Sequence, residues 1–158
     1  MADSRPRVVL DTVIYLQASI SATNVASSVL KRADADEIEL YVSKALVEEA
    51  RDVLNRPSIR LKNARLSDEE LARFLQSIES KARMIDPLPT HYRYGRDPND
   101  EHILNLAIEV RAAFIVTHDN DLLALMDANR VEGAEFRQRY PEITILTPGQ
   151  LLSHLNQL

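Results

Sequence analysis

The sequence predicts an α/β fold built on a mostly parallel central sheet of about five strands. Two observations carry this prediction. Short apolar runs alternate along the chain with segments of helical periodicity, and the clearest run, Val8–Leu10, is apolar at every position. A strand without polar alternation is buried on both faces, as in parallel sheets that helices cover. Strands separated by helices form βαβ units with right-handed crossovers, so the sheet is expected to be mostly parallel.

The strands are expected at five segments, of which the third is the weakest. These segments are Val8–Leu10, Glu37–Ser43, Arg83–Ile85, Ala113–Thr117 and Ile143–Leu146. Ligands bind to such sheets beyond the carboxyl ends of the strands. The residues that follow each segment are therefore the first place to look for a functional site.

Helices are expected between the strands. Ser67 and Glu70 have the spacing of a capping box, and apolar residues follow over residues 71–78 with helical periodicity. The segment Thr147–Gln150 places a proline at the first position of a final helix. Further helices are expected near residues 24–35, 44–55, 99–111 and 120–129.

The composition excludes several classes of protein. Of the 158 residues, 45% are hydrophobic and 27% charged, which predicts one globular domain over residues 1–158 rather than a disordered chain. The chain has no cysteine, which excludes disulfides, a thiol nucleophile and Cys-ligated metal sites. Polar residues enter the N-terminal segment too early for a signal peptide or a spanning helix, so we expect a cytoplasmic protein with no membrane partner.

Aspartates come directly after two of the expected strands. Asp11 follows Val8–Leu10, and Asp119 and Asp121 follow the strand that ends at Thr117. Taken singly, each is equally well explained as a helix N-cap or a turn residue. Parallel strands, however, present their carboxyl ends to one edge of the sheet, so these side chains are expected to converge.

The expected helix that begins at Lys44 supplies a further carboxylate. Apolar residues between Leu46 and Leu54 form one face of this helix, and Glu49 lies on the flank of that face while Glu48 points nearly opposite, into solvent. Taken alone, Glu49 is more simply a boundary residue. Together with the aspartates, it is expected to line the same cleft.

Two more acids begin the next expected helix, in the segment Arg96–Asp100. Asp97 has the position of an N-cap and is followed by a proline, and capping chemistry is sufficient to explain it. Asp100 projects close to Ala107, on the side of the helix that faces the sheet. A carboxylate in that position requires a partner, because an unpaired buried charge is costly.

The acids together indicate a metal centre. Asp11, Glu49, Asp100 and Asp119 are expected to meet at one edge of the sheet, with Asp97 and Asp121 just behind them. Carboxylates so close repel one another unless a cation lies between them, and a hard divalent cation, Mg²⁺ or Mn²⁺, is the usual solution. Such sites serve phosphodiester hydrolysis, because the cation activates water and stabilises phosphoryl charge.

Four segments, in this order and spacing, resemble the PIN domain, and most closely the VapC-type toxins of prokaryotic toxin–antitoxin modules. They are VVLDT, SKALVEEARDVLNRP, RDPNDEHILNLA and FIVTHDNDLL, and the resemblance extends from Arg7 to the closing TPGQLLSHL. It implies a PIN-like three-layer α/β/α sandwich and a Mg²⁺- or Mn²⁺-dependent endoribonuclease that cleaves single-stranded RNA as the toxin of such a pair. It also implies a cognate antitoxin and a homodimer. By motif position it assigns catalysis and metal binding to Asp11, Glu49, Asp100 and Asp119.

The chain departs from the family pattern at two positions. Val13 replaces an asparagine whose amide normally helps to hold the first aspartate, and His118 replaces a glycine. The first departure leaves open an alternative function, that of a catalytically impaired PIN-fold module that binds RNA or protein. His118 is open to two interpretations, a phosphate or metal contact and a plain surface residue. His102 and His154 are interpreted as surface residues of helices.

An acidic protein that binds RNA needs local basic surface. The net charge is −5, but residues 51–65 carry five basic groups and one acid, a local charge of +4. We expect phosphate contacts from this segment, although surface ion pairs are the simpler explanation. The residues concerned are Arg56, Arg60, Lys62 and Arg65.

A second candidate surface for RNA is the segment His91–Arg96, in which aromatic and basic residues alternate. This composition suits bases stacked on tyrosine and phosphates met by arginine. The alternative is a solvated loop whose tyrosine rings cover the edge of the core. The remaining candidates for substrate binding are Tyr92, Arg93 and Arg96 in this segment, and Thr12 and Thr117 beside the aspartates.

Overall fold

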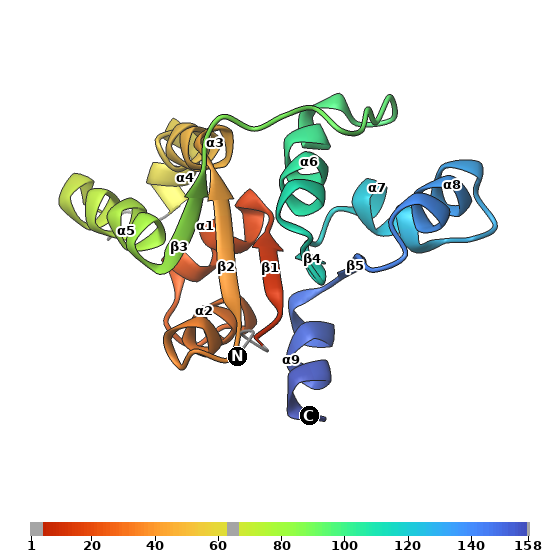
Figure 1. Ribbon diagram of the computed structural model, residues 1–158. Helices are drawn as coiled ribbons and strands as arrows, with labels where there is room; N and C mark the ends of the chain where they lie inside the picture. The colour runs from red at the N-terminus through yellow and green to blue at the C-terminus, as the bar shows by residue number, and fades with distance from the viewer. Residues whose placement is uncertain (1–4, 63–66, 158) are drawn as a thin grey trace.

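The computed structural model describes residues 5–62 and 67–157, and its centre is a five-stranded, all-parallel sheet in the order β3-β2-β1-β4-β5 (Figure 1). The predicted parallel sheet is confirmed, and each expected strand lies within two residues of its predicted bounds. The strands are β1 (Arg7–Leu10), β2 (Glu39–Ser43), β3 (Ala82–Ile85), β4 (Phe114–Val116) and β5 (Thr144–Leu146).

Helices connect every pair of successive strands in the described residues. They are α1 (Thr12–Ile20), α2 (Val25–Asp34), α3 (Lys44–Leu54), α4 (Pro57–Lys62), α5 (Asp68–Lys81), α6 (Glu101–Val110), α7 (Asn120–Leu123), α8 (Val131–Arg139) and α9 (Pro148–Asn156), with 3₁₀ turns η1 (Pro98–Asp100) and η2 (Ala124–Met126).

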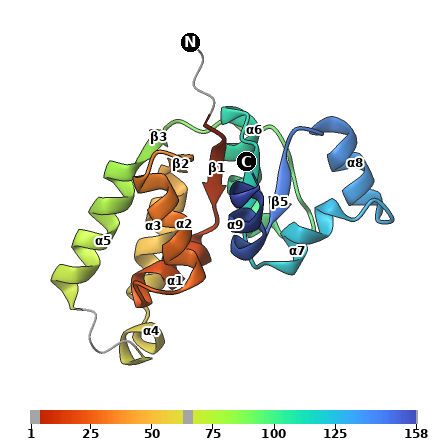
Figure 2. The same cartoon turned by 90° about the horizontal axis from the view of Figure 1, so that it is seen from below.

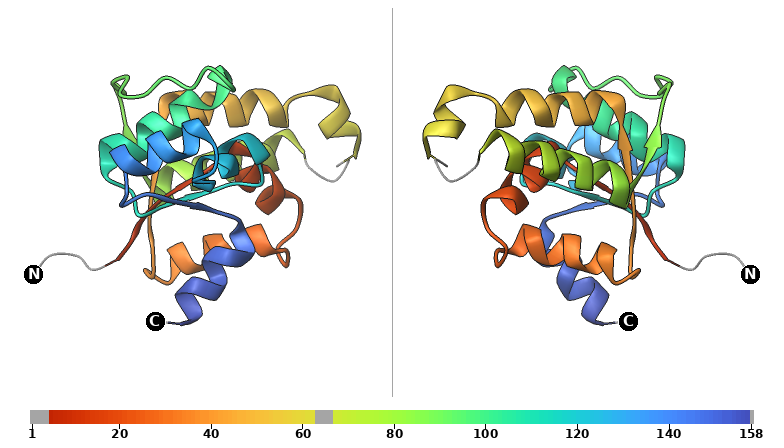
Figure 3. Two further views of the ribbon diagram at one scale, coloured as in Figure 1. Left: turned by 90° about the vertical axis from the view of Figure 1, so that its right-hand side faces the viewer. Right: turned by 90° about the vertical axis from the view of Figure 1, so that its left-hand side faces the viewer.

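The helices form two layers, one on each side of the sheet. From β1 through β2 to β3 the chain moves toward one edge, and from β3 through β4 to β5 it moves toward the other. Because the crossovers are right-handed, the two groups of connecting helices lie on opposite faces. Figures 2 and 3 show α1, α2, α3 and α5 with α9 on one side, and α6 and α8 on the other. The expected α/β/α sandwich is thus observed.

The core is centred on β1, which pairs with both β2 and β4. Val8, Val9 and Leu10 are fully buried, which explains why this strand is apolar at every position. Ile103 and Leu104 of α6 are also fully buried. Burial of each such side chain contributes about 1.5–3 kcal/mol, so the centre of the sheet is a rigid base for the residues that follow its strands.

Capping side chains fix where several helices begin. Ser43 accepts a hydrogen bond from the backbone N–H of Leu46, which sets the start of α3 immediately after β2. Thr147 and Gln150 form a complete capping box at α9. At α5 only half of the predicted box is present, since the Ser67 hydroxyl accepts from the Glu70 N–H.

Some helices differ from the sequence predictions. The sequence analysis did not predict α1, α4 or α8. The helix expected near 120–129 is present but ends earlier, because α7 continues into η2 and the chain leaves helical geometry at Asp127. The reason lies at Gly133 of α8, where an added Cβ would lie 2.1 Å from the Asp127 carbonyl oxygen. Because α8 packs so closely against the backbone at Asp127, the chain must turn there, and residue 133 must be a glycine.

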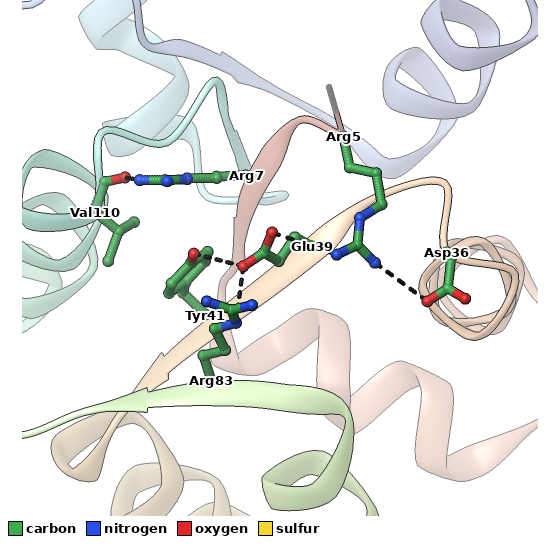
Figure 4. A network of polar contacts seen from close by, with 7 residues as sticks. All are labelled: Arg5, Arg7, Asp36, Glu39, Tyr41, Arg83 and Val110. Carbon is green, nitrogen blue, oxygen red and sulfur yellow. Dashed lines mark hydrogen bonds and ion pairs between the residues drawn. The ribbon is translucent and has the colours of Figure 1, made fainter. Parts of the chain in front are cut away.

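A polar network holds the amino-terminal ends of the strands (Figure 4). Asp11 follows the other, carboxyl end of β1. The largely buried Glu39 carboxylate accepts a hydrogen bond from the Tyr41 hydroxyl at 2.6 Å and pairs with Arg83 at 2.9 Å. Arg7 donates to the Val110 carbonyl at 2.9 Å, which ties β1 to the carboxyl end of α6. These contacts give Glu39 a structural role.

Within the described residues, no single helix is long and apolar enough to cross a membrane. The bent pair Thr12–Ile20 and Val25–Asp34 meets those criteria only when its two helices are taken together.

Candidate metal centre

Acidic side chains from four separate parts of the chain meet at the carboxyl edge of the sheet. Asp11 follows β1 and Asp119 follows β4, and these strands are parallel neighbours with Leu10 in register with Val116. Glu49 comes from α3, and Asp97 and Asp100 come from η1 and the residue before it. The topology of the sheet therefore brings together residues that are distant in sequence.

Thr117 links the two strand-end aspartates. Its hydroxyl donates to Asp11 Oδ2 at 2.7 Å and accepts from the Asp119 backbone N–H at 2.9 Å. Thr117 is fully buried, and its hydroxyl is engaged in both directions. It was predicted to bind substrate; in the structure its hydroxyl is bonded to the Asp11 carboxylate and to the Asp119 backbone.

Three carboxylates form the centre of the cluster. One oxygen from each of Asp97, Asp100 and Asp119 lies within 4.8 Å of the other two. Asp100 is only 9% exposed, and its Oδ2 atom is buried without a hydrogen-bond donor among the described residues. Burial, with the neighbouring Asp119, Asp11 and Asp97, raises the pKa of Asp100 from 3.8 to about 9. Without a cation, this acid therefore holds a proton at neutral pH.

Asp97 contributes to this cluster and does not cap the helix with its side chain. Its backbone carbonyl accepts from the Asp100 N–H at 3.2 Å, but its carboxylate makes no capping hydrogen bond. Asp97 is at the N-cap position, as expected, but capping chemistry does not account for its carboxylate. The pattern D-P-N-D is explained by helix capping alone, without reference to the residues around the Asp97 carboxylate. The sequence therefore contains no sign that this carboxylate lies at the centre of the acidic cluster.

Asp11 is buried beside these residues. Burial raises its pKa, hydrogen bonds from the Thr117 hydroxyl and the Thr12 backbone N–H lower it, and repulsion from Glu49 and Asp119 raises it further. The net direction is upward. Asp11 and Asp100 thus both favour a nearby positive charge.

Glu49 lies at the more open side of the site, with its side chain 38% exposed, while Glu48 is fully on the solvent side. Glu49 Oε2 accepts a hydrogen bond from the Thr12 hydroxyl at 3.0 Å and lies 2.7 Å from His102 Nε2. These contacts, chiefly that of His102, lower the pKa of Glu49, so it stays ionised. The helical phase that separated Glu49 from Glu48 is correct.

Two residues beside Glu49 were interpreted differently from the sequence. Thr12 was predicted to bind substrate, but it is buried and its hydroxyl is directed to Glu49. His102 was taken as a surface residue, but its side chain is only 19% exposed and contacts Glu49. No local sequence pattern predicts either contact with Glu49, because Thr12, Glu49 and His102 lie on three different helices.

The donor set suits a hard divalent cation. Carboxylate oxygens are the ligands that Mg²⁺ and Mn²⁺ prefer, and Asp100 Oδ2 is a buried acceptor that no described protein donor satisfies. Asp97, Asp100 and Asp119 are the residues placed to hold such an ion, with Asp11 buried beside them and Glu49 at the open side. The described part of the site contains no lysine that could substitute for the cation.

The other predicted residues lie outside this cluster. The Asp121 carboxylate pairs with Arg96 Nε at 2.9 Å, while its backbone N–H is capped by Asp119 Oδ1 at 2.7 Å. Arg93 is exposed and lies 4.0 Å from Glu101. The exposed His118 contacts Gln17, which favours its interpretation as a surface residue, and His154 is exposed on α9 as expected.

Tyr92 is buried, and this corrects its assignment as a base-stacking residue. Its ring packs edge-on against Phe136 of α8 at 5.5 Å between ring centres. The tyrosine rings of the segment 91–96 therefore cover the core, as the alternative interpretation held. Asn105, which the sequence analysis missed, fixes this segment: its Oδ1 accepts from the backbone N–H groups of both His91 and Tyr92. A buried asparagine on the apolar side of a helix is the signal that could have identified it.

The basic segment, residues 51–65, begins in the last turn of α3 and continues through α4, at the end of α3 far from the sheet (Figure 3). Arg56 is exposed and close enough to Glu49 to lower the pKa of that carboxyl. Arg60 forms an ion pair with Asp68, as in the simpler explanation, and Lys62 is exposed. Arg65 lies outside the described residues.

Comparisons with known proteins agree with the site's place in the chain. A protein-family model described as PIN domain matches residues 7–121, a range that includes all the acids described above. An uncharacterized protein of Methanocaldococcus jannaschii is 27% identical over 124 residues, which make up 78% of this chain and 77% of that protein.

Proposed function

Because the chain belongs to the PIN-domain family, whose fold is of the nuclease type, we propose that it is a metal-dependent endoribonuclease acting on single-stranded RNA. The observation that carries this proposal is the buried Asp100 oxygen, which has no described donor and lies beside Asp97 and Asp119. Such an arrangement is stable as a set of carboxylates only around a cation.

Each residue would have a definite role in this reaction. A bound Mg²⁺ or Mn²⁺ would supply an activated water and neutralise phosphoryl charge. Thr117 keeps Asp11 and Asp119 in fixed orientations through the two hydrogen bonds of its hydroxyl. Glu49, which is ionised and partly exposed, is placed on the side from which substrate enters.

The hydrogen bonds to Asp11 support an active enzyme over the impaired alternative, although Val13 replaces the family asparagine. The Val13 side chain is 43% exposed, so it does not fill the place of a buried amide donor. Asp11 is instead held by the Thr117 hydroxyl and by the Thr12 backbone N–H. The support that an asparagine would give to Asp11 is thus supplied by other groups in this chain.

The test is cleavage of end-labelled single-stranded RNA by the purified protein. We expect cleavage in Mg²⁺ or Mn²⁺, none in EDTA, and a loss of at least about 100-fold in Asp11→Asn. Duplex RNA and single-stranded DNA of the same sequence serve as substrate controls. Binding of RNA without cleavage in either metal would contradict the proposal and support the non-catalytic module.

The biological role extends this proposal on the resemblance to VapC-type toxins. We propose a cytoplasmic toxin that forms a homodimer and is neutralised by a cognate antitoxin. Induced expression should then arrest growth of the host cell, and Asp11→Asn should relieve the arrest. Light scattering on the eluted protein tests the dimer separately.

A further inference from the structure

The contact between His102 and Glu49 joins the two sides of the site. His102 lies on α6, two residues after Asp100, whereas Glu49 lies on α3. His102 Nε2 is 2.7 Å from Glu49 Oε2, and the Thr12 hydroxyl donates to this same oxygen at 3.0 Å. Two donors therefore converge on one carboxylate oxygen of a side chain that is otherwise flexible and 38% exposed.

The surroundings of His102 determine which ring nitrogen carries the proton. His102 Nδ1 is buried and has no hydrogen-bond partner among the described residues. A proton on Nδ1 would be a buried N–H without an acceptor, which is unfavourable. The proton is therefore assigned to Nε2, which donates to Glu49 Oε2.

We propose that His102 is a positioning residue: its Nε2–H, with the Thr12 hydroxyl, fixes Glu49 Oε2 and keeps Oε1 as the oxygen open to a metal ion or its bound water. The inference rests on the proposed metal-dependent function. Both hydrogen bonds to Glu49 in the described structure are made at Oε2, so Oε1 is not engaged by a protein donor there. Partners of this kind orient a ligand and raise its effective affinity.

The space around His102 makes the inference testable by substitution. One side of the residue borders an open pocket of about 320 Å³, whose lining includes Ala45, Leu88, Pro89 and Pro98. This space gives room for a side chain of different shape, so we expect substitutions of His102 to leave α6 in place. Changes in metal binding can therefore be separated from loss of the fold.

The first measurement is the affinity for Mn²⁺, by calorimetry, of the wild type, His102→Leu and His102→Gln. We expect His102→Leu to weaken binding by about 10- to 100-fold. His102→Gln should stay within about threefold, because its amide N–H can take the place of Nε2–H. The matched control is His154→Leu on α9, which should bind like the wild type. Thermal unfolding of each variant verifies the fold, and His102→Asn, whose amide is too short to reach Glu49, replaces His102→Leu if that variant does not fold.

The second measurement asks whether His102 acts through Glu49. In a Glu49→Gln background, His102→Leu should cause no further loss of Mn²⁺ affinity. Long-range ¹H–¹⁵N spectra of the metal-free protein should show a proton on Nε2 of His102. An equal loss of affinity in both backgrounds, or an Nε2 that carries no proton, would overturn the positioning role.

The two proposals fail in different ways. If the wild type binds Mn²⁺ and cleaves RNA while His102→Leu binds the ion equally well, the positioning role is wrong and the nuclease proposal stands. If the wild type binds no Mn²⁺, both are wrong.

Discussion

At the scale of single residues, the acids of the site differ in the hydrogen-bond donors that they receive. Asp11 accepts a hydrogen bond from the Thr117 hydroxyl, and Glu49 accepts hydrogen bonds from Thr12 and His102. Asp100 Oδ2 accepts none from the described residues. Their pKa values shift accordingly, downward for Glu49 and upward for Asp11 and Asp100. A cation is therefore required chiefly by Asp100 and its neighbours.

The raised pKa of Asp100 makes the metal-free protein less stable as pH rises. The folded state holds the proton up to about pH 9, whereas the unfolded chain releases it near 3.8, so unfolding releases a proton between these values. We expect Asp100→Asn to stabilise the metal-free protein at pH 8 by about 1–3 kcal/mol and to flatten the fall in unfolding free energy between pH 5 and pH 8. Urea denaturation in EDTA measures both, and a variant whose pH profile runs parallel to that of the wild type would contradict the assignment.

Glu49 and its neighbour Glu48 form a natural pair for a controlled comparison. Glu49→Gln should lower kcat/KM for RNA cleavage by about 100-fold or more, because it removes the charge at the open side of the site. Glu48→Gln changes the same charge on the same helix, but on the solvent side, and should leave kcat/KM within twofold. The opposite ranking would show that the site does not use Glu49.

At the scale of elements, the strands and the amphipathic helices were predictable from the sequence, whereas α1 and α8 were not. The burial of β1 on both faces leaves a continuous apolar run, and α3 shows its phase because it is buried along one side only. In contrast, α1 contacts both α2 and α3, so its apolar residues do not form one stripe. The position of α8 is determined mainly by the close contact of Gly133 with the backbone of Asp127. This is a tertiary contact.

The acids of the candidate site were predictable because strand ends in a parallel sheet share an edge, and that rule needs only the order of strands and helices. The side chains that support these acids, Thr117 and Thr12, could not be predicted in this way. Thr117 reaches Asp11 across 106 positions of sequence and Thr12 reaches Glu49 across 37, so no local pattern records either contact. Asp97 was placed only behind the principal acids for a related reason: the D-P-N-D pattern predicts an N-cap position whether or not the carboxylate makes a capping bond.

The segment from the end of α3 through α4 carries the prediction about RNA binding. We expect Arg56→Ala/Lys62→Ala to make the dependence of RNA affinity on salt shallower by roughly 1.4 in log–log slope, at about 0.7 per lost phosphate contact. Arg60→Ala is the matched control, because Arg60 is already paired with Asp68 and should contribute little to the slope. Filter binding over a salt series measures both, and identical slopes for the double variant and the wild type would leave this segment as solvated surface.

At the scale of the whole molecule, an acidic chain with a net charge of −5 has a cluster of carboxylates at one edge of its sheet. A cation that binds only the folded state stabilises it by about 2.7 kcal/mol at a hundredfold excess over Kd. For a domain of this size we therefore expect Mn²⁺ to raise Tm by roughly 5–10 °C. The increase should be larger at pH 8 than at pH 5, because protons compete with the cation at Asp100. Differential scanning fluorimetry tests this, and an equal increase in Asp100→Asn would exclude Asp100 as a ligand.

The central position of β1 also has a consequence for the order in which the protein folds. Its pairing with β2, as in Arg7 with Glu39, closes a much shorter loop than its pairing with β4, as in Val8 with Phe114. Because longer loops cost more entropy to close, the β1–β2 half is expected to assemble before β4 joins it. Asp11 and Glu49 belong to the early half, while Asp100 and Asp119 arrive with α6 and β4. Electrostatic repulsion is therefore concentrated in the last step of assembly, and a cation that binds only the joined halves should slow unfolding more than it accelerates folding.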